Sequence, residues 1–250
     1  MDTKKRSALT LLVLLVVLAL AAALNTILPQ GNIAGIPASQ SSQIPKWQLA
    51  LGGAGITLVL YGALGFLGFF LWRKLGFPEI WEETVSNRQR FGVPALVGVG
   101  LGVVLIIGDL LFSRINGVGR LIHPPFPTSL VASVSAGIGE EMLFRLFFIS
   151  FWTWLVGKVI LRGRGLNIVY WVVSAFSAIA FAAGHLPALM IIFGVTDPLK
   201  FSPVLLLEVL LLNSLISFFG AYYFKKSGFL ATVGIHFWTD IVWHMLWGLF

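Results

Sequence analysis

The segment Gly139-Glu-Glu-Met-Leu-Phe-Arg145 places two carboxylates and one guanidinium inside an apolar stretch that runs from Thr128 to about Gly157. A stretch of this length can cross the hydrocarbon core of a bilayer as a helix. Each charged side chain at the centre of a membrane helix costs about 3 kcal/mol, so such residues are rare and usually serve a function. The segment therefore predicts a membrane helix with a functional polar centre.

The composition extends this prediction to the whole chain. Of the 250 residues, 58% are hydrophobic and 11% are charged, whereas about a quarter of the residues of a soluble domain are charged. At about 20 residues per span, this composition provides for about seven membrane helices. We expect an all-α fold, a polytopic transmembrane helical bundle of about seven to eight membrane helices that forms a single domain over residues 1–250. The absence of cysteine excludes disulfides and thiolate chemistry.

The run Ala8–Leu24 follows three basic residues and fits either a signal peptide or a membrane anchor. We favour the anchor, because no clean small-x-small cleavage site precedes a polar loop. The apolar stretch Leu186–Val195 is too short to span and predicts a re-entrant or interfacial segment. Tryptophans at both ends of the second span predict interfacial anchors, and its glycines predict close helix packing. The expected spans are Ala8–Leu24, Trp47–Trp72, Pro94–Phe112, Thr128–Gly157, Leu166–Gly184, Pro203–Phe224 and Phe229–Leu249.

The basic residues predict the orientation of these spans. The formal charge of +7 fits loops that face the cytoplasm and its anionic lipids, and we do not expect nucleic-acid binding. A cytoplasmic N-terminus places most basic residues on the inside and predicts an external C-terminus. The inside set is Lys4, Lys5, Arg6, Arg73, Lys74, Arg88, Arg90, Lys158, Arg162, Arg164, Lys225 and Lys226, and the outside set is Lys46, Arg114, Arg120 and Lys200.

Helical geometry separates the two glutamates of the fourth span. Glu141 and Arg145 are four residues apart, so they share a helix face and are expected to form an ion pair. Glu140 points about 100° away from Glu141 and has no partner in its own helix. A carboxyl buried in this way suits general-base chemistry. The alternative is a purely structural triad that locks helix packing.

Further polar residues lie in the fifth and seventh spans. His185 follows Phe181 by four residues at the end of the fifth span, where it could also be a helix cap. His236, Asp240 and His244 recur every four residues and form one helical stripe, which fits a site or a packing seam.

The depths of these residues impose a condition on the fold. Counted from the cytoplasmic ends, Glu140 and His185 lie roughly 27 Å along their helices, whereas His236 and Asp240 lie roughly 10 to 20 Å along theirs. The seventh helix must therefore start deeper or tilt. Asp109 and Glu208 are expected to be isolated and interfacial, and His244 to approach the outer interface.

A base, two imidazoles and a carboxylate in a dry cavity suit water activation and hydrolysis of an acyl bond. Other motifs for this chemistry in membranes are absent from the sequence. There is no Gly-x-Ser-x-Gly and no His-Glu-x-x-His, and Asp109 lacks the first glycine of a Gly-x-Gly-Asp pattern.

Three motifs in order resemble those of the CPBP family, the type II CAAX prenyl endopeptidases and bacteriocin-processing (Abi) proteins. They are Glu140-Glu141-x-x-x-Arg145, Phe181-x-x-x-His185 and His236-x-x-x-Asp240. The segment Phe219–Leu230 also resembles the family's small-residue helix and turn before the last motif. The resemblance makes residues 128–250 the expected catalytic core and residues 1–127 additional N-terminal membrane helices.

The resemblance implies a multi-pass membrane endopeptidase of the cell membrane or endoplasmic reticulum, acting on a peptide or prenylated-protein substrate among membrane lipids. Glu140 would be the base that acts with His185 on water, and His236 and Asp240 would stabilise the oxyanion. Glu141 and Arg145, with Phe181, would support the site. An ionised Asp240 cannot donate to an oxyanion, so it would be protonated, orient His236 or bind a metal.

Two questions stay open at the level of sequence. His185, His236 and Glu140 could hold zinc in a His₂Glu arrangement, or the Glu/His pair could activate water unaided. Competing functions are a proton-coupled transporter and a non-catalytic membrane interaction or immunity protein. Against them, the chain shows no internal repeat and keeps every motif residue.

Overall fold

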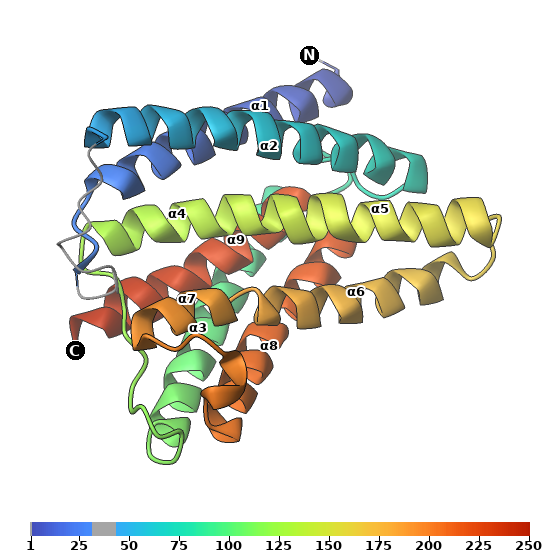
Figure 1. The fold of residues 1–250 in the computed structure, drawn as a ribbon. Helices are drawn as coiled ribbons and strands as arrows, with labels where there is room; N and C mark the ends of the chain where they lie inside the picture. Colours follow the sequence, from blue (N-terminus) through green and yellow to red (C-terminus); the bar gives the residue numbers. More distant parts are fainter. Residues whose placement is uncertain (1, 32–43) are drawn as a thin grey trace.

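A computed structural model describes residues 2–31 and 44–250, and in these ranges all regular secondary structure is helical (Figure 1). The expected all-α polytopic bundle is confirmed. Six helices in the described part are long and apolar enough to cross a membrane. They are Thr3–Ile27, Lys46–Leu75, Arg88–Phe112, Thr128–Ile160, Leu166–Phe193 and Pro203–Ser227.

The six long helices contain most of the labelled elements. The first two spans are α1 (Thr3–Ile27) and α2 (Lys46–Leu75). The fourth span is one continuous helix in which π-helical turns alternate with α-helical ones. The bounds of the remaining elements are α3 Val93–Phe112, α4 Thr128–Glu141, α5 Ser150–Trp152, α6 Leu166–Ala183, α7 Leu186–Phe193, α8 Pro203–Ser227 and α9 Phe229–Asp240, with π-helical turns Arg88–Gly92, Met142–Ile149, Thr153–Ile160 and Ile241–Leu246 and 3₁₀ turns Pro198–Lys200 and Trp247–Leu249.

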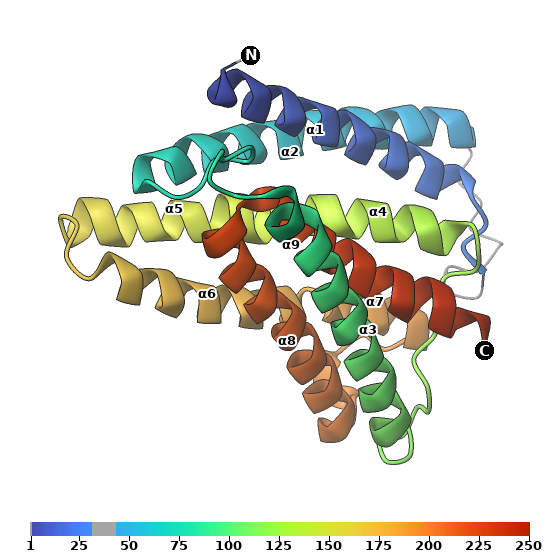
Figure 2. The same cartoon turned by 180° about the vertical axis from the view of Figure 1, so that it is seen from behind.

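The helices form three tiers around the fourth span. An antiparallel pair, α1 and α2, covers one side of the long α4–α5 helix, and α6 with α7 runs along its other side (Figure 1). Seen from behind, α3, α8 and α9 complete the bundle (Figure 2). Helix α9 packs against α3, α4 and α8 and is therefore the most central helix of the second half of the chain.

The seventh expected span is α9 with its continuation to Leu249, and it is not among the six long apolar helices. Both views show that α9 begins part-way along the α4–α5 helix rather than level with its end (Figures 1 and 2). The last helix thus starts deeper in the bundle, as the depths of His236 and Asp240 require.

Trp72 is buried rather than interfacial, which corrects the sequence-based expectation for that end of α2. It is 1% exposed, whereas Trp47 at the other end is 59% exposed. The Trp72 ring stacks on Phe224 of α8 and on Phe77, with centroid distances of 3.8 and 4.4 Å. Its Nε1 donates to the Pro78 carbonyl at 2.8 Å. The segment after α2 folds back over this tryptophan and fastens α2 to α8.

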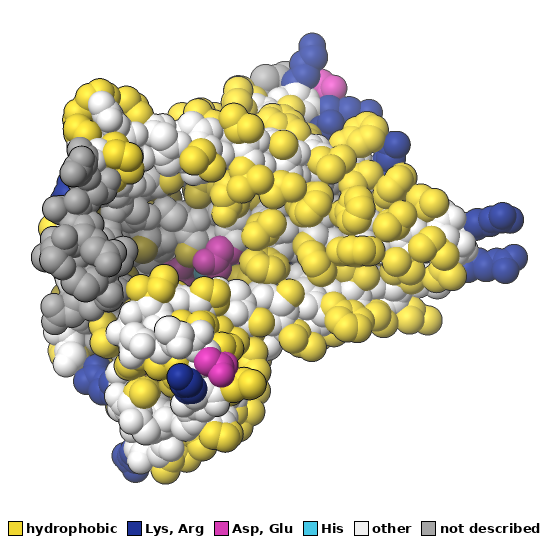
Figure 3. All heavy atoms as spheres, viewed as in Figure 1, with side chains coloured by type: hydrophobic (Ala, Val, Ile, Leu, Met, Phe, Trp, Pro, Cys, Tyr) yellow, Lys and Arg dark blue, Asp and Glu magenta, His cyan; other side chains and the backbone are white. Residues whose placement is uncertain are grey.

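The outer surface suits contact with lipid. Large apolar side chains are exposed along the helices, among them Val59, Leu96 and Ile168, and they cover the face seen in Figure 3. Many Lys and Arg side chains lie at the end of the molecule where α5 turns into α6, a turn that contains Arg162 and Arg164. An apolar belt with a basic end is the pattern of a membrane protein.

Of the six glycines in α2, Gly68 makes the closest approach to another helix, and a Cβ atom at Gly62 would also lie 3.3 Å from Leu15 Cδ2. A Cβ atom at Gly68 would lie 2.1 Å from the Leu146 carbonyl oxygen, so α2 approaches the fourth span backbone to backbone there. At Gly52 and Gly55 a Cβ atom would meet nothing within 4 Å. The expectation of close packing therefore holds at Gly68 and does not hold at the N-terminal end of the helix.

We predict that Gly68→Ala lowers the free energy of unfolding by about 1–3 kcal/mol, because the new methyl group forces the two helices apart. The matched variant Gly55→Ala adds the same methyl group in open space and should leave stability unchanged or slightly higher. Thermal unfolding in detergent measures both. Equal melting temperatures for the two variants would contradict the packing described here.

Candidate active site

The carboxylate of Glu141 connects three side chains at the centre of the bundle. Its Oε1 lies 3.0 Å from Arg145 Nη1, so the expected ion pair is confirmed, and both side chains are buried. The same oxygen lies 2.8 Å from His236 Nδ1, and Thr232 Oγ1 donates to Oε2. Because a carboxylate only accepts hydrogen bonds, the contact between Glu141 Oε1 and His236 Nδ1 assigns a proton to His236 Nδ1. Glu141 therefore joins the fourth span to α9 and orients the His236 ring.

The Arg145 guanidinium fits because its surroundings are small or aromatic. It lies 4.6 Å from the centroid of the Phe181 ring, a cation–π contact. A Cβ atom at Gly220 of α8 would lie 3.0 Å from Arg145 Nε and 2.9 Å from Thr232 Oγ1. Glycine at position 220 thus leaves room for the buried ion pair.

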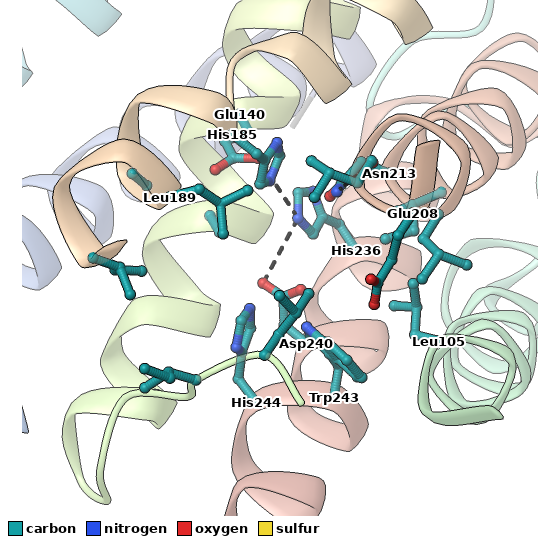
Figure 4. Close-up of a pocket in the computed structure, with 18 of the residues that line it drawn as sticks. Leu105, Glu140, His185, Leu189, Glu208, Asn213, His236, Asp240, Trp243 and His244 are labelled. Atoms are coloured by element: carbon teal, nitrogen blue, oxygen red, sulfur yellow. Dashed lines mark hydrogen bonds and ion pairs between the residues drawn. The ribbon is translucent and has the colours of Figure 1, made fainter. Parts of the chain in front are cut away.

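The second nitrogen of His236 faces two carboxyls. Its Nε2 lies 3.6 Å from Asp240 Oδ2 and 3.8 Å from Glu140 Oε2, as the dashed lines in Figure 4 show. His236 is 3% exposed, Asp240 is 5% exposed and the Glu140 side chain is 35% exposed. Glu140 is therefore the most accessible of the three groups.

His185 approaches Glu140 from the opposite helix. It lies in the turn between α6 and α7, and its Nδ1 lies 2.9 Å from the Phe181 carbonyl oxygen, which can only accept. The proton is therefore on Nδ1, and Nε2 is directed at Glu140 Oε2, 4.0 Å away. The Phe181 ring packs between the two imidazoles, with centroid distances of 5.0 Å to His185 and 5.6 Å to His236.

The structure thus brings together the four residues predicted as catalytic, Glu140, His185, His236 and Asp240, from three separate helices. Glu140 Oε2 is a buried atom with no hydrogen-bond partner among the described residues. It faces the Nε2 atoms of both imidazoles at distances too long for direct hydrogen bonds. A single water molecule bridges polar atoms at such separations.

The four residues line a cavity of about 240 Å³. Most of the remaining wall is apolar and comes from α3, α7, α8 and the last helix. Helix α7, the short apolar segment expected to be re-entrant or interfacial, supplies Leu189 and Phe193 to this wall. The apolar and amphipathic lining residues are Leu105, Leu121, Ile122, Ala136, Ala188, Leu189, Ile192, Phe193, Val209, Leu212, Ile216 and Trp243.

Glu140 also borders a second, more open groove of about 390 Å³ between α1, α2 and α4. Its polar lining includes Asn25, Tyr61 and Ser135, and Asn25 Nδ2 donates to Ser135 Oγ at 3.0 Å. The Glu140 carboxyl is therefore reached from two sides of the fourth span.

Asp109 and Glu208 are neither interfacial nor isolated, which corrects the expectation from sequence. Both are 0% exposed, and their carboxyls interact directly. Asp109 accepts from the Leu121 N–H at 3.0 Å and from Trp247 Nε1 at 3.3 Å. Packing of α3 against α8 places both acids inside the bundle.

His244 lines the cavity and pairs with a histidine outside the membrane helices, rather than ending at the outer interface. Its Nδ1 lies 3.2 Å from Nδ1 of His123, in the segment that joins α3 to α4. Burial lowers the pKa of His123 to about 4. His123 is therefore neutral near pH 7, and one ring donates to the other.

Sequence reasoning missed two polar residues of the cavity wall, Glu208 and Asn213 of α8. Asn213 was not singled out, and Glu208 was assigned to the interface. Their place in the sequence could have identified them, because both Glu208 and Asn213 lie in one apolar membrane helix, where polar side chains tend to face a cavity or a partner.

The donor set expected for zinc is not assembled. Glu140, His185 and His236 surround one point, but no group of three or more His, Asp or Glu side chains in the described ranges is placed to hold a metal ion.

Residues 122–242 match the family model described as "Type II CAAX prenyl endopeptidase Rce1-like". This segment contains every motif residue from Glu140 to Asp240. The match covers just under half of the chain, residues 122–242. No curated protein and no solved structure matches the chain. The Rce1-like match supports the CPBP resemblance.

Breaking the buried ion pair between Glu141 and Arg145 should be costly. We predict that Arg145→Met lowers the free energy of unfolding by about 3–5 kcal/mol, because it leaves the Glu141 carboxylate buried without its cation. Adding Glu141→Gln to this variant should restore part of the loss. Thermal unfolding in detergent of both single variants and the double variant measures the coupling. Arg164→Met, on an exposed turn, is the control, and additive losses for the pair would contradict direct pairing.

Proposed function

We propose that this protein is an intramembrane endopeptidase that hydrolyses a peptide bond near the C-terminus of a prenylated or other membrane-associated substrate by Glu/His-activated water. The observation that carries the proposal is the position of Glu140 Oε2, buried, unpartnered and facing the Nε2 atoms of His185 and His236 at 4.0 and 3.8 Å. The Rce1-like match supports the same class of reaction.

The first step is attack by water. Glu140 and His185 hold a water molecule between them, and Glu140 accepts one of its protons as general base. The water oxygen forms a bond to the carbonyl carbon of the substrate, and the electron pair of the C=O bond moves to the carbonyl oxygen. The apolar wall on the cavity side lowers the local polarity around the reacting groups, which strengthens these electrostatic interactions.

The second step depends on His236 and Asp240. A protonated His236 donates from Nε2 to the oxyanion, while Glu141 holds the ring at Nδ1. Asp240, 3.6 Å from Nε2, supports the charged imidazole and does not itself donate to the oxyanion. When the tetrahedral intermediate collapses, the C–N bond breaks and Glu140 returns its proton to the leaving nitrogen. The products are a carboxylate and an amine.

The substrate and the membrane setting follow from the same features. The apolar cavity suits a peptide or prenylated-protein segment that reaches the site from the membrane, with lipids as the surroundings. Residues 128–250 supply all the proposed catalytic groups, and residues 1–127 supply additional helices.

Glu140→Gln should lower kcat by about 10²–10⁴-fold, because the amide cannot accept the proton from water. Cleavage of a quenched farnesylated CAAX peptide by purified protein in detergent measures this change. The exposed variant Glu83→Gln is the matched control and should cleave at the wild-type rate. Near-normal cleavage by Glu140→Gln would contradict the assignment of the base.

We expect cleavage of the same peptide to be unaffected by o-phenanthroline, because Glu140 and His185 act without a metal in this proposal. The chelator is added to wild-type protein before the substrate, and excess zinc is added back in a parallel sample. Loss of activity that zinc restores would replace unaided water activation with a zinc-dependent reaction.

The orientation proposed from the basic residues places the N-terminus in the cytoplasm and the C-terminus outside. A reporter that is active only outside the membrane, fused after Phe250, should therefore be active, and the same reporter fused to the Arg162–Arg164 turn should be silent. The reverse pattern would refute this orientation.

A further inference from the structure

Glu208 is a buried acid in the cavity wall that the proposed chemistry does not use. It is 0% exposed and lies on α8, and in Figure 4 it appears on the other side of His236 from Glu140. Its Oε2 accepts from Asn116 Nδ2 at 2.8 Å. Its Oε1 is buried and has no hydrogen-bond partner among the described residues. One oxygen is therefore held by Asn116, and the other has no hydrogen-bond donor among the described residues.

The carboxyl behind Glu208 adds negative charge without a counter-ion. Asp109 interacts directly with Glu208, and the partners of Asp109 are the neutral Leu121 N–H and Trp247 indole. Within residues 2–31 and 44–250, neither acid forms an ion pair with Lys, Arg or His. Two adjacent buried carboxyls without a cation favour the uptake of a proton or of a cationic ligand.

The charges of the cavity wall favour a cation as the ligand. The wall contains the carboxyls of Glu140, Glu208 and Asp240 and the imidazoles of His185, His236 and His244, and no Lys or Arg side chain from the described residues lines it. Near Glu208 the wall is apolar, with Leu105, Val209 and Leu212. An apolar wall beside a carboxyl that lacks a counter-ion suits an alkyl chain that ends in a positive charge, which is the chemistry of a lysine or arginine side chain.

We propose that Glu208 is a specificity-determining residue that binds the cationic head group of a basic side chain in the substrate segment held in the cavity. Asn116 and Asp109 position the Glu208 carboxyl, and the apolar wall covers the stem of the basic side chain. That the ligand is a side chain of the substrate rests on the proposed function. The cation site at Glu208 does not depend on the proposed function.

A binding experiment tests the cation site independently of catalysis. n-Hexylammonium is added to purified protein in detergent, with 1-hexanol as its neutral counterpart, and the melting temperature is recorded for wild type and Glu208→Gln. Glutamine keeps an oxygen that can accept from Asn116 and removes the charge. We expect hexylammonium to raise the melting temperature of wild type by several degrees more than hexanol, and this difference to disappear in Glu208→Gln. An equal response of the two proteins to the amine would overturn the site and leave a purely structural acid pair.

A cleavage experiment tests the role of Glu208 in specificity. Farnesylated CAAX peptides are compared in which lysine or norleucine occupies each of the three positions after the modified cysteine. At one of these positions the wild-type kcat/KM should favour lysine about tenfold or more, as expected for a charge-assisted contact. Glu208→Gln should lose this preference, so that the lysine and norleucine peptides have similar kcat/KM values. A preference that persists in Glu208→Gln would overturn the role in specificity.

The two experiments separate failure of this inference from failure of the proposed function. Binding of hexylammonium that depends on Glu208, without cleavage of any peptide, would keep the cation site and refute the protease. Cleavage that depends on Glu140, without any effect of charge in either assay, would keep the protease and refute the cation site.

Discussion

The buried carboxylate of Glu141 is the interaction on which the site depends. A charge in the centre of a membrane bundle is tolerated only if the protein supplies its partners. Arg145 supplies the opposite charge from the same helix, and Thr232 and His236 supply hydrogen-bond donors from α9. The need to satisfy this one carboxylate therefore fixes α9 against the fourth span and aims Nε2 of His236 at the cavity. The contacts that stabilise the buried Glu141 carboxylate therefore also position His236 in the proposed active site.

The neighbouring carboxyl, Glu140, is used in the opposite way. One residue earlier on the same helix, it points to the cavity and faces two histidines rather than a Lys or Arg. Its surroundings are two imidazoles held by their other nitrogens, one by Glu141 and one by the Phe181 carbonyl. Two adjacent residues of one helix thus differ in role: Glu141 is a structural acid, and Glu140 is the proposed general base. The apolar wall on the cavity side then lowers the local polarity around Glu140.

Much of the site could be predicted from the sequence because it depends on spacing within single helices. The Glu141–Arg145 pair follows from a separation of four residues, and the motif residues indicate which helices meet. The depth at which α9 begins could not be predicted, because it is set by packing on α3, α4 and α8. The same reason explains the errors at Trp72 and Glu208. Position near the end of a helix suggested an interface, but a returning loop buries the first, and the contact of α3 with α8 buries the second.

The central claim is that Glu140 removes a proton from water and does not itself attack the peptide bond. A single turnover in H₂¹⁸O, with protein in excess over a farnesylated CAAX peptide, tests this claim most directly. Mass spectrometry of the cleaved peptide and of the protein fragment that contains Glu140 locates the label. The account predicts ¹⁸O in the new carboxylate of the product and none in Glu140. Label in the Glu140 side chain after one turnover would show a covalent acyl intermediate and contradict the account.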